Sequence, residues 1–183
     1  YLGGRIERCL IRGNTARVGG GVAGMFHGFV ENCLVVGNTA GQGGGIHCSQ
    51  YTGIRNCTIA GNNAQTGGGI DAFFGGRIEN SIVYFNTAAQ GSNVFVRASP
   101  DNGASFIFSC TAPLPMGEGN TNADPLFVNM AAGDFRLQAS SACMDAASSA
   151  VAPTNDLAGE TRPLDGNGDS VPVPDMGSYE YRP

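Results

Sequence analysis

The stretch Asn32-Cys-Leu-Val-Val-Gly-Asn-Thr-Ala-Gly-Gln-Gly-Gly-Gly-Ile46 recurs along the chain with a period of 24 residues. Repetition at a fixed period of roughly 20–50 residues is the sequence signature of a solenoid, in which each repeat packs only against its neighbours. The glycine triplet keeps its register in three copies and becomes Gly91-Ser92-Asn93 in the fourth. The columns of residues spaced 24 apart are Asn14, Asn38, Asn62 and Asn86; Cys9, Cys33, Cys57 and Ser81; Ile6, Val30, Ile54 and Ile78; Ile11, Val35, Ile59 and Val83; and Val22, Ile46, Ile70 and Val94.

Apolar residues within one copy alternate over short stretches separated by Gly and Asn, which predicts three short strands joined by tight turns. A unit of 24 residues cannot bury its own apolar side, so the copies must stack with their strands about 4.8 Å apart. The sequence therefore predicts an all-β fold, a parallel β-helix with one repeat per coil, right-handed because parallel crossovers strongly prefer that hand. Residues 1–100 form the coils, and residues 101–183 form the last coil and an irregular C-terminal cap.

The composition excludes other classes of protein. Of the 183 residues 29 are Gly, and Gly costs about 1 kcal/mol relative to Ala inside a helix, which argues against a helical protein. A hydrophobic fraction of 42% with a net charge of −5 argues against disorder. No apolar run approaches the ~20 residues of a membrane span. The few Arg and the absence of Lys argue against a nucleic-acid partner.

Two parts of the chain resemble known families. The repeat at 32–46 is similar to the right-handed parallel β-helix repeats of bacterial secreted proteins, including the polymorphic-outer-membrane-protein type. The motifs at 120–128, 133–137, 141–146 and 175–181 resemble the C-terminal region of choice-of-anchor Q domain proteins. The resemblance implies a secreted protein of the bacterial cell surface, mostly without demonstrated activity. Because Tyr1 begins inside a coil and no sorting segment follows the cap, we expect a piece of a longer exported chain.

The asparagine column at 14, 38, 62 and 86 predicts an inward amide ladder at a turn, with an ordinary solvent-facing turn residue as the alternative. Cys9, Cys33 and Cys57 share one interior column, where an odd member would be left over, and we interpret them as small buried hydrophobes. Cys48 also points inward. Cys110 and Cys143 lie outside the repeat, and a disulfide between them, closing a loop of ~33 residues, would stabilise the fold by about 3–4 kcal/mol.

The segment from Asp165 to Val171 reproduces the first half of a calcium loop, with oxygens at positions 1, 3, 5 and 7. Met176 occupies position 12, where a Glu is expected, so only a neighbouring carboxylate could complete the shell. The alternative is an acidic surface turn without an ion. The predicted ligands of Ca²⁺, the only cofactor expected, are Asp165, Asn167, Asp169, the carbonyl of Val171, and Asp175.

One corner of the predicted solenoid gathers aromatic side chains next to the outward pair His47 and Asp71. Aromatic rings beside polar groups suit the stacking of sugar rings, although an apolar corner under a loop or a neighbouring protomer is the alternative. The predicted ligand-binding residues are Phe26, His27, Gln50, Tyr51, Phe73 and Phe74. A second apolar strip, Leu10, Leu34, Ile82, Val36 and Tyr84, should be covered by the C-terminal segment.

Catalysis would need carboxylates with a strong base, or a pair of carboxylates at roughly 6.5–9.5 Å. Among the outward residues only His47, Asp71 and Arg55 offer such groups, and no Ser or Cys nucleophile shares the face of His47. The column Glu7, Glu31, Arg55 and Glu79 looks structural, because Arg55 separates two acids.

These patterns favour a non-catalytic module of the bacterial surface that is adhesive, contacts carbohydrate or serves as a scaffold. One alternative is an extracellular polysaccharide lyase or glycoside hydrolase. Another is a self-assembling subunit of a filament or layer, whose uncapped N-terminal coil exposes strand edges. The predicted partners are a polysaccharide or cell-surface glycan, or a second copy bound end to end.

Overall fold

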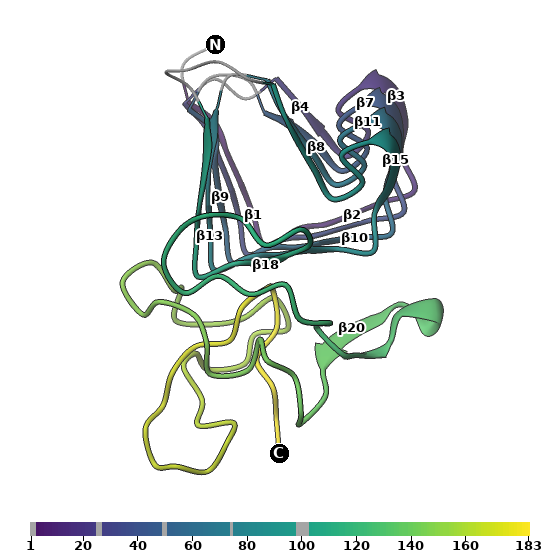
Figure 1. The fold of residues 1–183 in the computed structure, drawn as a ribbon. Helices are drawn as coiled ribbons and strands as arrows, with labels where there is room; N and C mark the ends of the chain where they lie inside the picture. The colour runs from purple at the N-terminus through teal and green to yellow at the C-terminus, as the bar shows by residue number, and fades with distance from the viewer. Residues whose placement is uncertain (1–2, 25–26, 49–50, 74, 98–102) are drawn as a thin grey trace.

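The computed structural model describes residues 3–24, 27–48, 51–73, 75–97 and 103–183. Figure 1 looks along the solenoid, whose coils lie behind one another and carry four parallel sheets. Sheet A consists of β1 (Arg5–Glu7), β5 (Phe29–Glu31), β9 (Gly53–Arg55), β13 (Gly76–Glu79) and β17 (Ala104–Ile107). Sheet B consists of β2 (Leu10–Arg12), β6 (Leu34–Val36), β10 (Thr58–Ala60), β14 (Ile82–Tyr84) and β18 (Cys110–Thr111).

The other two sheets end one coil earlier. Sheet C consists of β3 (Thr15–Val18), β7 (Thr39–Gln42), β11 (Asn63–Thr66) and β15 (Thr87–Gln90). Sheet D consists of β4 (Val22–Ala23), β8 (Ile46–Cys48), β12 (Ile70–Ala72) and β16 (Val94–Val96). The predicted parallel β-solenoid of about four turns is therefore confirmed. The prediction of three strands per coil is wrong, because sheet C was not expected: its buried side presents only small residues such as Ala40 and Ala64, so its strands lack an apolar signature.

The interior is filled by the predicted apolar columns. Val30, Ile54 and Ile78 are entirely buried, as are Val35, Ile59 and Val83, and they form one cluster with Ile46 and Ile70 of sheet D. Cys33, Cys48 and Cys57 are buried in the same cluster as free thiols, as predicted, whereas Cys9 of the first coil packs against the cluster but is only partly buried. Each inward column thus contributes one apolar residue per coil.

The predicted amide ladder is confirmed. The Oδ1 atom of Asn38 accepts hydrogen bonds from the backbone N–H (3.0 Å) and the side-chain amide (3.1 Å) of Asn14, one coil earlier. Asn38 makes the same pair of bonds to Asn62, at 2.9 and 3.0 Å, and Asn62 makes them to Asn86. All backbone and side-chain donors of the turn are satisfied in this way without water.

Asn93 ends the ladder. Its Oδ1 accepts from the backbone and side chain of Asn86 at 3.1 and 3.2 Å, and its own amide donates to Ala112 O. In the earlier coils this position is Gly, because a Cβ atom at Gly69 would lie 2.8 Å from the Asn86 amide nitrogen. The change in the fourth glycine triplet is therefore a terminal cap for the ladder.

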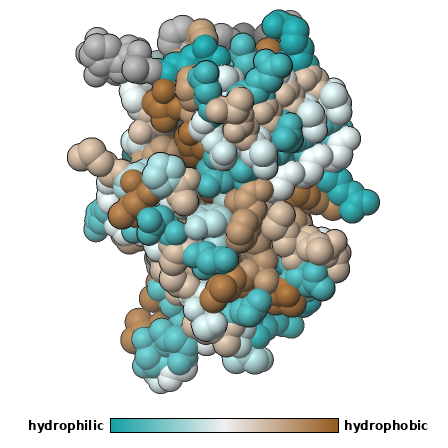
Figure 2. Space-filling model, turned by 45° about the vertical axis from the view of Figure 1, so that its right-hand side comes forward, coloured by the Kyte–Doolittle hydropathy of each residue, from teal (hydrophilic) through white to brown (hydrophobic). Residues whose placement is uncertain are grey.

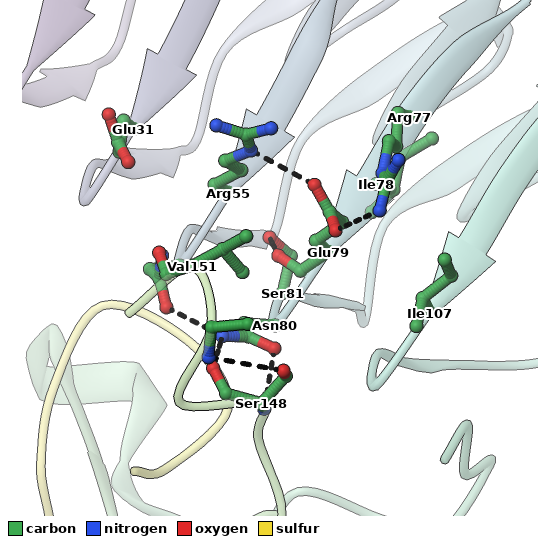
Figure 3. Close-up of polar contacts among 12 residues, drawn as sticks. Glu31, Arg55, Arg77, Ile78, Glu79, Asn80, Ser81, Ile107, Ser148 and Val151 are labelled. Carbon is green, nitrogen blue, oxygen red and sulfur yellow. Dashed lines mark hydrogen bonds and ion pairs between the residues drawn. The ribbon is translucent and has the colours of Figure 1, made fainter. Parts of the chain in front are cut away.

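A second asparagine column, which the sequence analysis did not identify, joins the coils to the C-terminal region. Asn32, Asn56 and Asn80 are buried with positive φ, and their amides donate to the carbonyls of Asn155, Val151 and Ser148. Figure 3 shows Asn80 facing Ser148, whose N–H also donates to Asn80 Oδ1 at 2.9 Å. Each coil thereby holds one carbonyl of the cap.

Residues 112–183 form the cap, which lies beneath sheet B in Figure 1 and contains the hairpin of β19 (Phe127–Asn129), the 3₁₀ turn η1 (Met130–Ala132) and β20 (Asp134–Leu137). Leu34 and Ile82 of the predicted apolar strip pack with Phe127, Phe135 and Met176, so the expected cover is confirmed. Leu10 is the exception and stays exposed. On the face drawn in Figure 2, the remaining hydrophobic residues are scattered in small groups among hydrophilic ones.

Cys110 and Cys143 meet where the cap joins sheet B, but both are free thiols, so the predicted disulfide is not formed. Contact with the Cys110 thiol and burial raise the pKa of Cys143 far above its ordinary value. Because only a thiolate attacks, this apolar site keeps the Cys143 thiol protonated and unreactive. Within the described ranges, no helix is long and apolar enough to cross a membrane.

We expect Asn38→Ala to lower the free energy of unfolding by about 1–3 kcal/mol, because it removes the side-chain amide that donates to the buried Oδ1 of Asn62 and the acceptor of the Asn14 N–H. Denaturation in urea measures the change. Asn63→Ala is the matched control: Asn63 is exposed, and its substitution should change stability by no more than about 0.5 kcal/mol. Equal effects of the two substitutions would contradict the structural role of the ladder.

Candidate functional site

Sheet D places three side chains in one outward row, the predicted pair His47 and Asp71 and a third residue, Phe95. His47 of β8, Asp71 of β12 and Phe95 of β16 are partners in the strand register. Phe73 and Arg97 follow two residues later in the third and fourth coils and come from the same face. We call His47, Asp71, Phe73, Phe95 and Arg97 the Asp71 cluster.

Asp71 is the centre of this cluster and is completely buried. Its Oδ2 atom lies 3.2 Å from Arg97 Nη2 and 3.5 Å from His47 Nδ1. Burial acts to raise the pKa of Asp71, but the contacts with His47 and Arg97 outweigh it and hold the pKa below its usual range. Asp71 is therefore an ionised group that orients two potential hydrogen-bond donors.

The guanidinium of Arg97 lies against two aromatic rings. Its Cζ atom is 4.9 Å from the centre of Phe73 and 5.5 Å from the centre of Phe95, both within the range of a cation–π contact. The ring of His47 packs against Phe73 at 5.9 Å. About a third of the Arg97 side chain stays exposed, at 34%, so it is the charged group of the cluster that a ligand can reach.

The cluster holds more hydrogen-bonding capacity than its own residues use. Within the described ranges, Oδ1 of Asp71, Nδ1 of His47 and Nε of Arg97 are buried and make no hydrogen bond, although Nδ1 of His47 lies 3.5 Å from Asp71 Oδ2. Buried polar atoms in native proteins are nearly always paired, and exceptions concentrate at functional positions. Three such atoms in contacting side chains mark the Asp71 cluster as the strongest polar site on the solenoid.

The corner between sheets D and A carries a stacked pair of rings. His27 and Tyr51 lie one coil apart with ring centres 5.0 Å apart and planes at 23°. Both have positive φ, at 52° and 59°, in a column whose neighbours Gly3 and Gly75 share that conformation. Neither of these glycines has a side chain to continue the column, and Tyr51 is 63% exposed. A bulky residue held in the left-handed region is strained, and such strain clusters at binding sites.

The structure brings part of the predicted ligand site together. His27, Tyr51 and Phe73 lie at the corner as expected, whereas Phe26, Gln50 and Phe74 lie outside the described residues. Arg97 was missed, although the 24-residue register places it directly above Phe73 and two positions after Phe95. Following each outward column into the fourth coil would have found it.

Arg55 does not join His47 and Asp71, so the predicted catalytic set is not assembled. It belongs to sheet A, where its Nε donates to Glu79 Oε2 at 2.9 Å (Figure 3). Its guanidinium also lies 4.7 Å from the centre of the Phe29 ring. Glu31 pairs with Arg5 instead. The structural role predicted for this charged column is thus confirmed, and the cation beside Asp71 is Arg97.

The calcium prediction loses one of its ligands. Asp165, Asn167 and Asp169 turn their side-chain oxygens toward backbone amides of their own loop. Asp175 is buried in the cap, where it accepts from the N–H groups of Asp145 and Tyr181 and where burial and Glu180 raise its pKa to about 7.

The carboxylate that faces the loop is Asp145, which accepts from Gly166 N and Asn167 N. In the described part of the chain, no three His, Cys, Asp or Glu side chains converge as metal ligands do. Calcium binding at 165–171 stays a prediction without Asp175.

Comparison with models of known protein families and with curated protein sequences finds no match to this chain. The resemblance to choice-of-anchor Q domain proteins therefore rests on the motifs at 120–128, 133–137, 141–146 and 175–181 alone.

We expect the stability contributed by Asp71 to be lost in acid. Its folded pKa lies below the unfolded value of about 3.9, so this stability is present above that pH and disappears as the pH falls through the folded pKa. Unfolding in urea between neutral and strongly acid pH should show a shallower acid loss in Asp71→Asn than in the unsubstituted protein. Asp124→Asn, at an exposed loop position, should keep the full acid loss. An unchanged acid profile in Asp71→Asn would contradict the ionised, paired state of Asp71.

If loop 165–171 binds calcium, millimolar Ca²⁺ raises the melting temperature by mass action, and a chelator reverses the increase. We expect this increase in the unsubstituted protein and not in Asp169→Asn, while Mg²⁺ at equal concentration controls for ionic strength. A melting temperature that does not respond to Ca²⁺ would remove the calcium prediction.

Proposed function

We propose that this protein is an exported module of the bacterial cell surface that binds polysaccharide along sheet D and the adjoining corner, without catalysing a reaction. The observation that carries the proposal is the Asp71 cluster, a buried carboxylate that holds an exposed arginine between two aromatic rings. The surface location is supported by the motif resemblance alone.

The proposed binding surface combines stacking with hydrogen bonding. Tyr51 offers an exposed ring whose outer face is bounded by Gly75, and an aromatic face can stack on the apolar side of a sugar ring. Arg97 offers a guanidinium whose position is fixed by Asp71. Fixed donors lose little conformational entropy on binding, so they bind a specific ligand more favourably than donors on flexible side chains do.

The charge of the cluster favours neutral polysaccharides. The positive charge of Arg97 is already balanced by Asp71 at 3.2 Å, so little net field remains to attract a carboxylate. The N–H groups of Arg97, whose side chain is 34% exposed, instead suit the oxygens of hydroxyl groups, which accept hydrogen bonds. We therefore expect neutral, hydroxyl-rich chains to bind more tightly than uronate polymers.

A second candidate function is a polysaccharide lyase or hydrolase. The contact of 3.5 Å between His47 Nδ1 and Asp71 Oδ2 is the observation that favours it, since a carboxylate beside a histidine can orient a general base. Arg97, rather than Arg55, would then be the cation beside the reacting group.

The test is affinity electrophoresis of the protein through gels that contain neutral polysaccharides (xylan, galactomannan) or acidic ones (polygalacturonate, alginate). We expect retention by a neutral polymer, and at least tenfold weaker retention for Tyr51→Ala and for Arg97→Gln. Arg77→Gln is the matched control, because Arg77 is an exposed arginine in an ion pair with Glu79 on sheet A. Urea denaturation verifies that each variant is folded.

Absence of retention by every polymer, or equal retention of all variants, would contradict the proposal. Turnover of a uronate polymer that disappears in His47→Ala would replace it with the enzymatic function.

A further inference from the structure

The cap contains a pocket that is separate from the solenoid surface. It has a volume of about 480 Å³ and lies between the end of β20, the loop 156–160 and the C-terminal segment 179–182. Cavities of this size accommodate small ligands, with room for roughly one or two sugar rings. No residue of the Asp71 cluster or of the calcium-like loop lines it.

Buried ionic contacts hold the walls of the pocket in place. Glu180 and Arg162 form an ion pair of 2.6 Å in which both side chains are completely buried. Asp156, also buried, accepts from Glu160 N at 2.8 Å and from Glu180 N at 3.0 Å, and so ties the loop to the C-terminal segment. The pocket is therefore formed before any ligand arrives, which lowers the entropy cost of binding.

Two tyrosines provide its aromatic wall. Tyr179 and Tyr181 both line the pocket, whereas Glu180 between them turns away into the ion pair with Arg162. Both rings are partly exposed. Burial and the nearby carboxylate of Asp156 raise the pKa of Tyr179, so its hydroxyl group stays protonated and able to donate.

The charges around the pocket are balanced in pairs. Arg136 donates to Asp134 at 2.9 Å, and Arg182 pairs with Glu160. A ligand with a net negative charge would meet the carboxylates of Asp156 and Glu160, and a purely apolar ligand would leave polar walls without partners. A neutral ligand rich in hydroxyl groups satisfies both conditions and can stack on a tyrosine ring.

We propose that this pocket is a second binding site, for a neutral saccharide unit, formed by Tyr179, Tyr181 and the loop 156–160. This proposal goes beyond the function proposed for sheet D, because the cap pocket uses other residues. The pocket would hold a short saccharide unit, whereas sheet D would bind along a polymer chain. The two sites on one protein would bind one long polymer with greater avidity than either site alone.

The experiment measures binding of neutral oligosaccharides (xylotriose, mannotriose) to the full chain by isothermal titration calorimetry and saturation-transfer NMR. It is carried out in the Tyr51→Ala background, so that the sheet D site does not contribute. Ala158→Trp is the blocking variant: Ala158 is exposed at the pocket wall, and the indole fills the cavity without disturbing the core. Ala150→Trp, at an exposed position of the cap outside the pocket, is the matched control.

We expect at least tenfold weaker binding in Ala158→Trp and in Tyr181→Ala, and unchanged binding in Ala150→Trp. Binding that survives Ala158→Trp, or no binding of any neutral oligosaccharide in the Tyr51→Ala background, would overturn the cap site. Either result leaves the sheet D proposal intact, since that proposal is tested with Tyr51→Ala and Arg97→Gln on long polymers.

Discussion

The amide ladder is the interaction on which the rest of the molecule depends. Each ladder oxygen accepts from a backbone N–H and from a side-chain amide of the coil before it, as Asn62 does from Asn38. Both bonds are buried, so an inserted or deleted residue would leave unpaired donors in the interior as well as shifting the apolar columns out of register. This constraint keeps successive ladder asparagines 24 residues apart from Asn14 to Asn86, and outward side chains of these coils lie directly above their counterparts. The step from β13 to β17, in contrast, spans 28 residues, with Ile78 paired to Phe106.

Because the coils stack at about 4.8 Å, like charges in one outward column would repel each other unless they are compensated. Sheet A balances them in two ways: Arg55 pairs with Glu79 in its own column, and Arg5 of a neighbouring column pairs with Glu7 and Glu31, which are stacked on each other. Sheet A also places the ring of Phe29 over Gly53, where a Cβ atom would lie 2.5 Å from the ring. Sheet D follows a different rule, because Asp71 is stacked between an imidazole and a phenyl ring and is compensated by an arginine from the next column. The acids of sheet A are therefore neutralised by arginines of that sheet, whereas Asp71 depends on Arg97 and His47, and this difference is why the binding proposal is centred on sheet D.

The sequence predicts most of the coil and little of the cap. The apolar and asparagine columns of the coil could be identified because packing and the ladder repeat the same residue type in every copy. Sheet C was missed because its pairing relies on the backbone, and the column Asn32, Asn56 and Asn80 was missed because its partners are backbone carbonyls far away in the chain. The cap could be predicted to cover the apolar strip with Leu34 and Ile82. Its ion pair Arg162–Glu180 and its pocket could not be predicted, because the cap has no repeat and these features join residues far apart in the chain.

The way the cap is attached also determines which side of the solenoid stays available. Its hydrogen bonds go to the asparagine column at the junction of sheets A and B, and its apolar residues pack beneath sheet B. Sheet D lies on the other side of the coil from the cap in Figure 1. The cap therefore closes the apolar strip without covering the Asp71 cluster or Tyr51. A protein built this way keeps a stacked, linear surface on its coils and a partly open pocket in its cap, and these are the two surfaces to which we propose that a long polymer and a short saccharide unit bind.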